Sequence, residues 1–259
     1  MSALATAGMT TAPTVRVPLS RLVRVELRKQ LNTRAARGLL IALVCLTLVL
    51  TVPAIWFLEP ANLTFAALVN ASLLPQMLLV PIVAILSITG EWSHRTTTVT
   101  FVLQPARLRV IAAKAAASLV LALVLLASGI LFAALSNIAG MLLRDGDGSW
   151  SLDPAVLGGT VLVLCLLVLQ GLGFGLLVIN TPLAIVLWYG LPLGFSTAAA
   201  ALPALRDVAA LTDLNVTISP LAEGTMTTGD LLPLLLSAVI WIGIPLVLGT
   251  LRTLKREVK

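Results

Sequence analysis

The sequence predicts an all-α integral membrane protein with six transmembrane helices, and three observations lead to this fold class. Only 11% of the 259 residues are charged, whereas about 25% is usual for a soluble domain. The mean hydropathy is +1.06, and 59% of the residues are hydrophobic. The apolar residues gather in long runs, and roughly 20 consecutive apolar residues are enough to cross a bilayer as a helix.

The N-terminal region divides into two parts. We expect residues 1–16, which are small and polar, to form a disordered tail. In residues 17–36 apolar positions recur at helical spacing, and three basic residues share the opposite face: Arg21, Arg24 and Arg28. This pattern predicts a basic amphipathic helix that lies on an anionic membrane surface. Glu26 falls on its apolar side and is expected either to pair with Lys29 or to contact another buried polar group.

Six apolar runs predict the transmembrane spans. They cover residues 38–58, 63–89, 111–142, 155–179, 182–203 and 231–251. The third run is long enough for part of it to project beyond the bilayer. The fourth and fifth are divided only by Asn180-Thr181-Pro182, where Pro182 favours the start of a new helix. Together, residues 17–251 are expected to form one transmembrane domain.

The basic residues orient these spans. Fifteen of the 17 lysines and arginines lie before the first span, between the second and third, or after the sixth, and only Arg144 and Arg206 lie in the other loops. Basic residues concentrate in cytoplasmic loops. The distribution predicts an even number of spans, both termini in the cytoplasm, a basic cytoplasmic tail at 252–259, and a multi-pass protein of the plasma or inner membrane.

The remaining loops are expected outside. The loop at 143–154 is acidic and rich in glycine but lacks the EF-hand pattern, so we predict no metal site there. The longest loop, at 204–230, is expected to form short helices that re-enter the outer membrane face. Cys45 and Cys165 lie inside apolar runs and are read as small hydrophobic residues.

The chain has no nucleotide-binding or catalytic motif of its own. It contains no G-x-x-x-x-G-K-[ST] sequence, and no ionisable side chain lies in the middle of a predicted span. Ion-coupled transporters and intramembrane enzymes usually need such groups at depth. We therefore predict a membrane subunit that is not an enzyme and has no cofactor of its own.

Neutral polar residues and glycines inside the spans carry two further predictions. Ser72 and Gln76 share one face of the second span, where interhelical hydrogen bonds are the favoured interpretation and the wall of a substrate path is the alternative. Gly171 and Gly175 form a G-x-x-x-G pair, which is typical of close helix packing.

A polar segment at 90–114 separates the second and third spans on the predicted cytoplasmic side. Residues 91–105 are expected to form a short helix along the membrane surface, ended by Gln104-Pro105. A rigid surface helix between two long spans would transmit a push from a cytosolic partner to both spans.

This segment resembles one in the membrane subunits of ATP-binding-cassette exporters, the ABC type-2 permeases. The resemblance rests on Gly90-Glu91, the aromatic Trp92, Arg95-Thr96, Pro105, Arg107 or Arg109, and Ala113-Lys114, in this order. The amphipathic stretch at 17–36 is similar to the connecting helix of that family, and six spans with inside termini match as well. The chain departs from the pattern at His94-Arg95-Thr96, where the family has Gly before Thr, which leaves the register of this helix open.

The resemblance implies a mechanism. Two permease chains would form a translocation path, and two cytosolic ATPase subunits, which bind the ATP and Mg²⁺, would press on a coupling helix at 91–105. It implies coupling contacts by Glu91, Trp92, Arg95, Thr96 and Arg107, and a connecting helix that carries Arg24, Glu26 and Arg28. The alternative for the charged coupling residues is that they face solvent or lipid headgroups. The resemblance also implies that the second and fifth spans line the path, with Ser72, Gln76 and Ser196 as the candidate contacts. The expected substrate is amphipathic or hydrophobic: a drug, a lipid or a peptide. No nucleic-acid partner is expected.

Two other classes of function stay open. A non-transporting scaffold or sensor subunit would share the spans and the coupling segment. A secondary transporter is the weaker alternative, because the predicted spans lack ionisable groups at depth. The resemblance leaves open whether the permease pair is a homodimer or a heterodimer.

Overall fold

The computed structural model describes residues 17–93, 100 and 106–255, and within these ranges the chain forms helices and turns without a strand. Three parts of the sequence-based predictions lie outside the described residues: the tail at 1–16, most of the helix expected at 91–105 (Arg95 and Thr96 included), and residues 256–259 of the basic tail.

Six helices are long and apolar enough to cross a membrane, so the predicted multi-pass all-α fold is confirmed at this level. They are α2 (Arg34–Phe57), α3 (Phe65–Ser93), α5 (Arg107–Arg144), α6 (Pro154–Val178), α7 (Thr181–Ala201) and the run Thr228–Lys255. The last run contains α11 (Leu231–Ala238), a π-helical turn (Val239–Gly243) and α12 (Ile244–Lys255). Each predicted span boundary falls within four residues of the boundary in the structure.

The division between α6 and α7 shows how the local sequence ends one helix and starts the next. Ile179 adopts the left-handed conformation (φ 56°), which is costly for a β-branched residue and stops the helix. The side chain of Asn180 then accepts a hydrogen bond from the Leu183 N–H at 3.0 Å, so it caps α7. Pro182 follows in the first turn, where it needs no hydrogen-bond partner.

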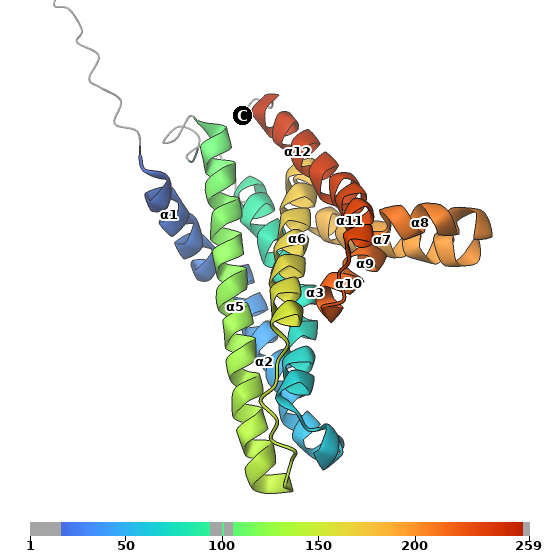
Figure 1. The fold of residues 1–259 in the computed structure, drawn as a ribbon. Helices are drawn as coiled ribbons and strands as arrows, with labels where there is room; N and C mark the ends of the chain where they lie inside the picture. Colours follow the sequence, from blue (N-terminus) through green and yellow to red (C-terminus); the bar gives the residue numbers. More distant parts are fainter. Residues whose placement is uncertain (1–16, 94–99, 101–105, 256–259) are drawn as a thin grey trace, which may run out of the picture.

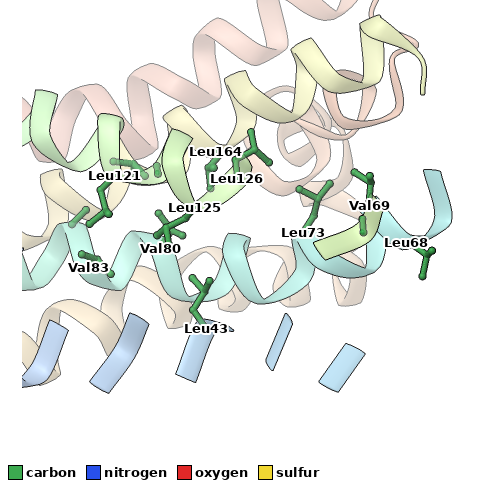
Figure 2. Packing of buried hydrophobic residues seen from close by; sticks show 14 of the residues in the cluster. Leu43, Leu68, Val69, Leu73, Val80, Val83, Leu121, Leu125, Leu126 and Leu164 are labelled. Atoms are coloured by element: carbon green, nitrogen blue, oxygen red, sulfur yellow. The ribbon is translucent and has the colours of Figure 1, made fainter. Parts of the chain in front are cut away.

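The core lies around α3, which contacts α2, α5, α6 and α7. Leu43 of α2 reaches toward α3 from one side and Leu125 of α5 reaches toward it from the other (Figure 2). Val80 of α3 is 2% exposed at this point. By contrast, only 22% of the most apolar stretch is buried in each of α2, α7 and the last run, as expected of helices that face lipid or another protein chain.

Glycines allow α6 to approach its neighbours closely. A Cβ atom on Gly171 would lie 2.6 Å from the carbonyl oxygen of Pro81 in α3, and one on Gly175 would lie 3.4 Å from Ile85. The predicted pair therefore sits directly against α3. Gly249 of α12 approaches α6 in the same manner, since its Cβ would lie 2.6 Å from the Leu177 nitrogen.

The segment after α7 folds into short helices. These are a 3₁₀ turn (Pro203–Leu205), α8 (Arg206–Thr212), α9 (Leu214–Thr217) and α10 (Ser219–Glu223). In Figure 1, α7 and α8 run out sideways from the bundle, whereas α10 packs against α6. Short helices were predicted here; their position relative to a membrane stays a prediction.

The two ends of the bundle differ in composition. The start of α1 (Leu19–Asn32), the start of α5 and the end of α12 lie together at one end (Figure 1). We call this end, where α3 also ends, the basic end, because Lys29, Arg107, Lys114 and Arg252 lie there. At the far end α5 continues to Arg144. Its 38 residues correspond to about 57 Å of helix, which exceeds the roughly 30 Å hydrocarbon core and agrees with the predicted projection.

Candidate functional site at the basic end of the bundle

Four charged side chains from three helices meet at the basic end, and we call them the ion cluster: Glu26 and Lys29 of α1, Glu91 of α3 and Lys114 of α5. Lys114 Nζ lies 2.7 Å from Glu26 Oε2 and 3.1 Å from Glu91 Oε1. Lys29 Nζ lies 2.8 Å from Glu26 Oε1 and 2.7 Å from Glu91 Oε1. Each carboxylate therefore binds both ammonium groups, and the charges of the cluster cancel.

Because these ion pairs are buried, breaking one of them would cost folding free energy. The side chains of Lys114 and Glu26 are 5% and 6% exposed, and that of Glu91 is 13% exposed. A buried charge is costly unless it is paired and hydrogen-bonded. Lys114 also donates to the carbonyl oxygen of Ser87 at 2.9 Å, so its ammonium group is bound by α1 and α3 together. The ion cluster thereby joins α1 to α3 and α5.

The structure decides how Glu26 acts, since both proposed contacts form. It pairs with Lys29 three residues later, and it also contacts the buried Lys114 of another helix. One turn further along α1, Gln30 Nε2 donates to Ser118 Oγ of α5 at 3.0 Å. On the otherwise apolar side of α1, Glu26 and Gln30 therefore form polar contacts with Lys114 and Ser118 of α5.

Lys29 is the most accessible member of the ion cluster, with 40% of its side chain exposed. Burial lowers the pKa of Lys29, but the hydrogen bonds and charges of Glu26 and Glu91 outweigh burial and raise this pKa above its usual value. Lys29 is therefore positively charged throughout the physiological pH range.

Arginine side chains bind the carbonyl ends of helices near the cluster. Arg107 Nη1 at the start of α5 donates to the carbonyl oxygens of Thr253 (2.8 Å) and Leu254 (3.3 Å) in the last turn of α12. Arg252 donates to the carbonyl oxygen of Leu177 at the end of α6. The last carbonyls of a helix lack partners within it and carry its negative dipole end. Arg107, predicted as a coupling residue, thus fastens α5 to α12.

The other residues predicted for the coupling and connecting helices differ in their burial, and two of them lie outside the described residues. Trp92 lies half-buried in the last turn of α3, next to Glu91. Arg24 and Arg28 are exposed on α1, on the side away from Glu26. Arg95 and Thr96 lie outside the described residues.

The three candidates for a substrate path lie in two environments. Ser72 and Gln76 are 0% exposed inside the bundle, where α3 faces Gly129 of α5. Ser72 Oγ donates to the carbonyl oxygen of Val69 at 2.7 Å. Ser196 of α7 instead donates to the carboxylate of Asp213, which caps α9.

Two buried charges were missed from the sequence. Lys114 was noted as a basic residue and as part of the resemblance, but not as a buried charge, and Asp213, which is 1% exposed, was not singled out within the loop at 204–230. For Lys114 the available signal was its place among small apolar residues of the third span. A charged residue inside an apolar run requires a buried partner, and Glu26 on an apolar helix face was the matching one.

A cavity of about 720 Å³ adjoins the ion cluster, between α1, α2, α3 and α5. Glu26, Lys29, Glu91 and Lys114 all line it. Within the described part of the chain, His, Cys, Asp and Glu residues form no group of three that would hold a metal ion, and Cys45 and Cys165 are free thiols.

Comparison with known proteins adds no assignment to this geometry. No protein-family model, no curated protein and no solved structure matches the chain.

Proposed function

We propose that the chain is the membrane subunit of an ABC-type exporter, driven by ATP hydrolysis in a separate cytosolic ATPase. The observation that carries this proposal is the ion cluster. The cluster joins α1, which corresponds to the connecting helix, to the last turn of α3 and to α5. In the chain, α3 comes before the segment that resembles a coupling helix, and α5 follows it. A force on that segment would reach two spanning helices and α1 at once.

The chemistry of the cluster suits this task. Buried ion pairs specify one arrangement of the groups they join, because a slipped arrangement leaves a charge unpaired in a low-dielectric surrounding. In the proposal, α1 and the ends of α3 and α5 move as one body when the ATPase closes. Arg107 extends this body to α12 through the carbonyl oxygen of Thr253.

The transport role belongs to the same proposal. The mostly exposed apolar faces of α2 and α7 would be covered by lipid and by a second permease chain, and the path would run between the two chains. An amphipathic or hydrophobic substrate is proposed because the spans present chiefly apolar side chains. The membrane is proposed to be the plasma or inner membrane, with both termini in the cytoplasm.

The experiment is affinity purification of the tagged full-length chain from its native cells, followed by an ATPase assay in nanodiscs. We expect copurification of a P-loop ATPase whose activity requires the chain and is lost when residues 93–104 are deleted. Absence of any such ATPase from the purified material would contradict the proposal.

A flux measurement separates the exporter from a scaffold or sensor subunit. Proteoliposomes that contain the complex are loaded with amphipathic fluorescent dyes, and ATP-dependent movement of a dye across the membrane is followed. Movement that requires ATP supports the exporter, whereas ATPase binding without flux of any dye favours the scaffold. Uptake driven by an ion gradient without ATP would favour a secondary transporter.

A further inference from the structure

The helices that follow the middle of α7 form a group of their own, which we call the side unit: residues 193–201 of α7 together with α8, α9 and α11. Figure 1 shows α7 and α8 running out sideways from the bundle. Within the side unit, α11 packs against α8 and α9, and α7 packs against α8. By contrast, α12, which continues the same span as α11, packs against α6 of the bundle. The last span is therefore shared between the side unit and the bundle.

Buried polar contacts hold the side unit together. The hydroxyl groups of Thr217 in α9 and Ser237 in α11 share a hydrogen bond of 2.6 Å, and these residues are 5% and 0% exposed. Ser196 of α7 donates to the carboxylate of Asp213, which precedes α9 and is 1% exposed. Separating these helices would leave buried polar groups without partners, which is unfavourable. The helices of the side unit therefore favour moving together.

The last span changes from the side unit to the bundle at the π-helical turn Val239–Gly243. Trp241 in this turn still contacts the side unit. Its Nε1 donates to the carbonyl oxygen of Thr212 at 2.8 Å, and its ring centroid lies 5.9 Å from that of Phe195. Gly249, two turns later, already packs on α6. A π-helical turn interrupts regular α-helical hydrogen bonding and often marks a functional position.

The helix α7 changes its contacts at Pro192. Before this residue, Thr181 Oγ1 donates to Thr89 Oγ1 of α3 at 2.7 Å, and Tyr189 donates to the carbonyl oxygen of Leu78 in α3. After it, α7 makes the contacts of the side unit. Pro192 lies inside the helix and has no N–H for the carbonyl group four residues earlier, which weakens the helix at this point. Both spans that join the side unit to the bundle are therefore irregular at the boundary.

We propose that the side unit opens and closes as one body relative to the bundle, with Pro192 and the π-helical turn as its hinges. Hinges are a few residues that absorb changes in the backbone angles between two bodies. The two other connections, Ile218 between α9 and α10 and residues 224–230 before α11, lie outside the α-helices. Such a device changes the shape of the molecule beside α7 while the contacts of α3, α5 and α6 stay in place. It does not rest on the proposed transport role.

The test is hydrogen–deuterium exchange of the purified full-length chain in detergent, read by mass spectrometry. Amides that one motion exposes share one opening free energy. The last span offers a matched pair of variants, because Ser237 and Thr253 are buried hydroxyl residues on either side of the π-helical turn. Ser237 bonds to Thr217 in the side unit, whereas Thr253 donates to the carbonyl oxygen of Gly249 in its own helix.

Ser237→Ala should speed the exchange of every segment of the side unit by the same factor, about fivefold, equivalent to about 1 kcal/mol. Residues 193–201 decide the test, because the lost hydrogen bond joins α9 to α11 and not to α7. The first half of α7 and α12 should be unchanged, and Thr253→Val should leave the side unit unchanged. A change confined to α9 and α11, an equal change over the whole chain, or an effect of Thr253→Val on the side unit would overturn the proposal. If Ser237→Ala fails to fold, Thr217→Val removes the same hydrogen bond from the side of α9.

The hinge in α7 is tested by Pro192→Ala. Alanine restores the missing N–H donor, so the side unit should exchange more slowly, by about the same factor as above. Pro53→Ala, inside α2, is the control and should leave the side unit unchanged. Equal exchange in wild type and Pro192→Ala would exclude this hinge. No ATPase is present in these measurements, so their failure leaves the exporter proposal intact, and failure of the exporter proposal leaves the side unit intact.

Discussion

Charged side chains buried at the basic end are the main feature at the scale of the residue. Glu26 and Lys114 lie 88 positions apart in the chain, yet they form an ion pair with both side chains almost fully buried. The sequence indicated that Glu26 could contact a buried polar group, because Glu26 lies on the apolar face of an amphipathic helix. The partner was not predictable from periodicity, since the choice of Lys114 depends on how α1 docks on α5.

Removing one member of this pair should destabilise the protein strongly. We expect Lys114→Met to lower the free energy of unfolding by about 3 kcal/mol, because it leaves a buried carboxylate with one cation fewer. Lys255→Met at the exposed end of α12 is the control and should have little effect. Thermal unfolding of the purified chain in detergent measures both.

A double variant separates the pair from its surroundings. Glu26→Gln combined with Lys114→Met should cost less than the sum of the two single variants, with a coupling of about 0.5–3 kcal/mol. Strict additivity would show that the two side chains do not interact in the folded protein.

The Lys29 pairs should be insensitive to pH over the physiological range. Because the carboxylates raise the pKa of Lys29, its stabilising contribution is complete below the unfolded pKa of about 10.4. The contribution is lost only as the pH rises through the still higher folded pKa. The difference in unfolding temperature between the wild type and Lys29→Met should therefore stay constant from about pH 6 to 9 and shrink above about pH 10.4. A difference that fades between pH 6 and 9 would contradict this assignment.

At the scale of the element, glycines on α6 decide how close its neighbours come. The sequence predicted Gly171 and Gly175 as packing positions, and the structure places both against α3. The sequence pattern did not identify Gly159 as a packing position, although a Cβ at Gly159 would lie 1.6 Å from the carbonyl oxygen of Leu221 in α10. Gly171 and Gly175 stand four residues apart, and this G-x-x-x-G spacing is typical of a contact between two long helices. Gly159 contacts only the short helix α10, and such a contact produces no repeated glycine spacing in the sequence.

Two adjacent glycines of α6 provide a sharp test of this packing. Gly158→Ala should be neutral or stabilise by up to about 1 kcal/mol, because its Cβ meets open space and alanine favours the helix. Gly159→Ala should destabilise by about 1–3 kcal/mol, because the new methyl group overlaps backbone that must shift. Thermal unfolding gives the comparison, and limited proteolysis after α10 should accelerate only in Gly159→Ala. Equal effects at the two positions would refute the close approach of α10.

The long apolar runs allowed the spanning helices to be predicted closely, but not their arrangement. Run lengths and the capping residue Asn180 set the boundaries, since they are local properties. The sideways course of α7 (Figure 1) and the central position of α3 depend on contacts between distant segments. Those contacts leave no periodic signal in a single sequence.

At the scale of the whole molecule, the charge asymmetry gives a topology that is directly testable. Single cysteines are introduced at Ser149 and Lys255 in a chain without Cys45 and Cys165. We expect a membrane-impermeant thiol reagent to label the Ser149→Cys variant in intact cells, and the Lys255→Cys variant only after permeabilisation, because basic ends stay in the cytoplasm. Labelling of both variants in intact cells would contradict an even number of spans with inside termini.

In the proposed mechanism, the ion cluster transmits the force that a separate ATPase exerts on the segment at 91–105 to α1, α3 and α5. The most direct measurement is the ATP hydrolysis rate of the copurified complex in nanodiscs, compared between Glu91→Gln and the matched change Glu59→Gln at the exposed far end. We predict that Glu91→Gln lowers the rate about fivefold or more, which corresponds to about 1 kcal/mol in the activation free energy. Glu59→Gln should leave it unchanged. Equal rates in both variants, with the complex intact, would contradict the account.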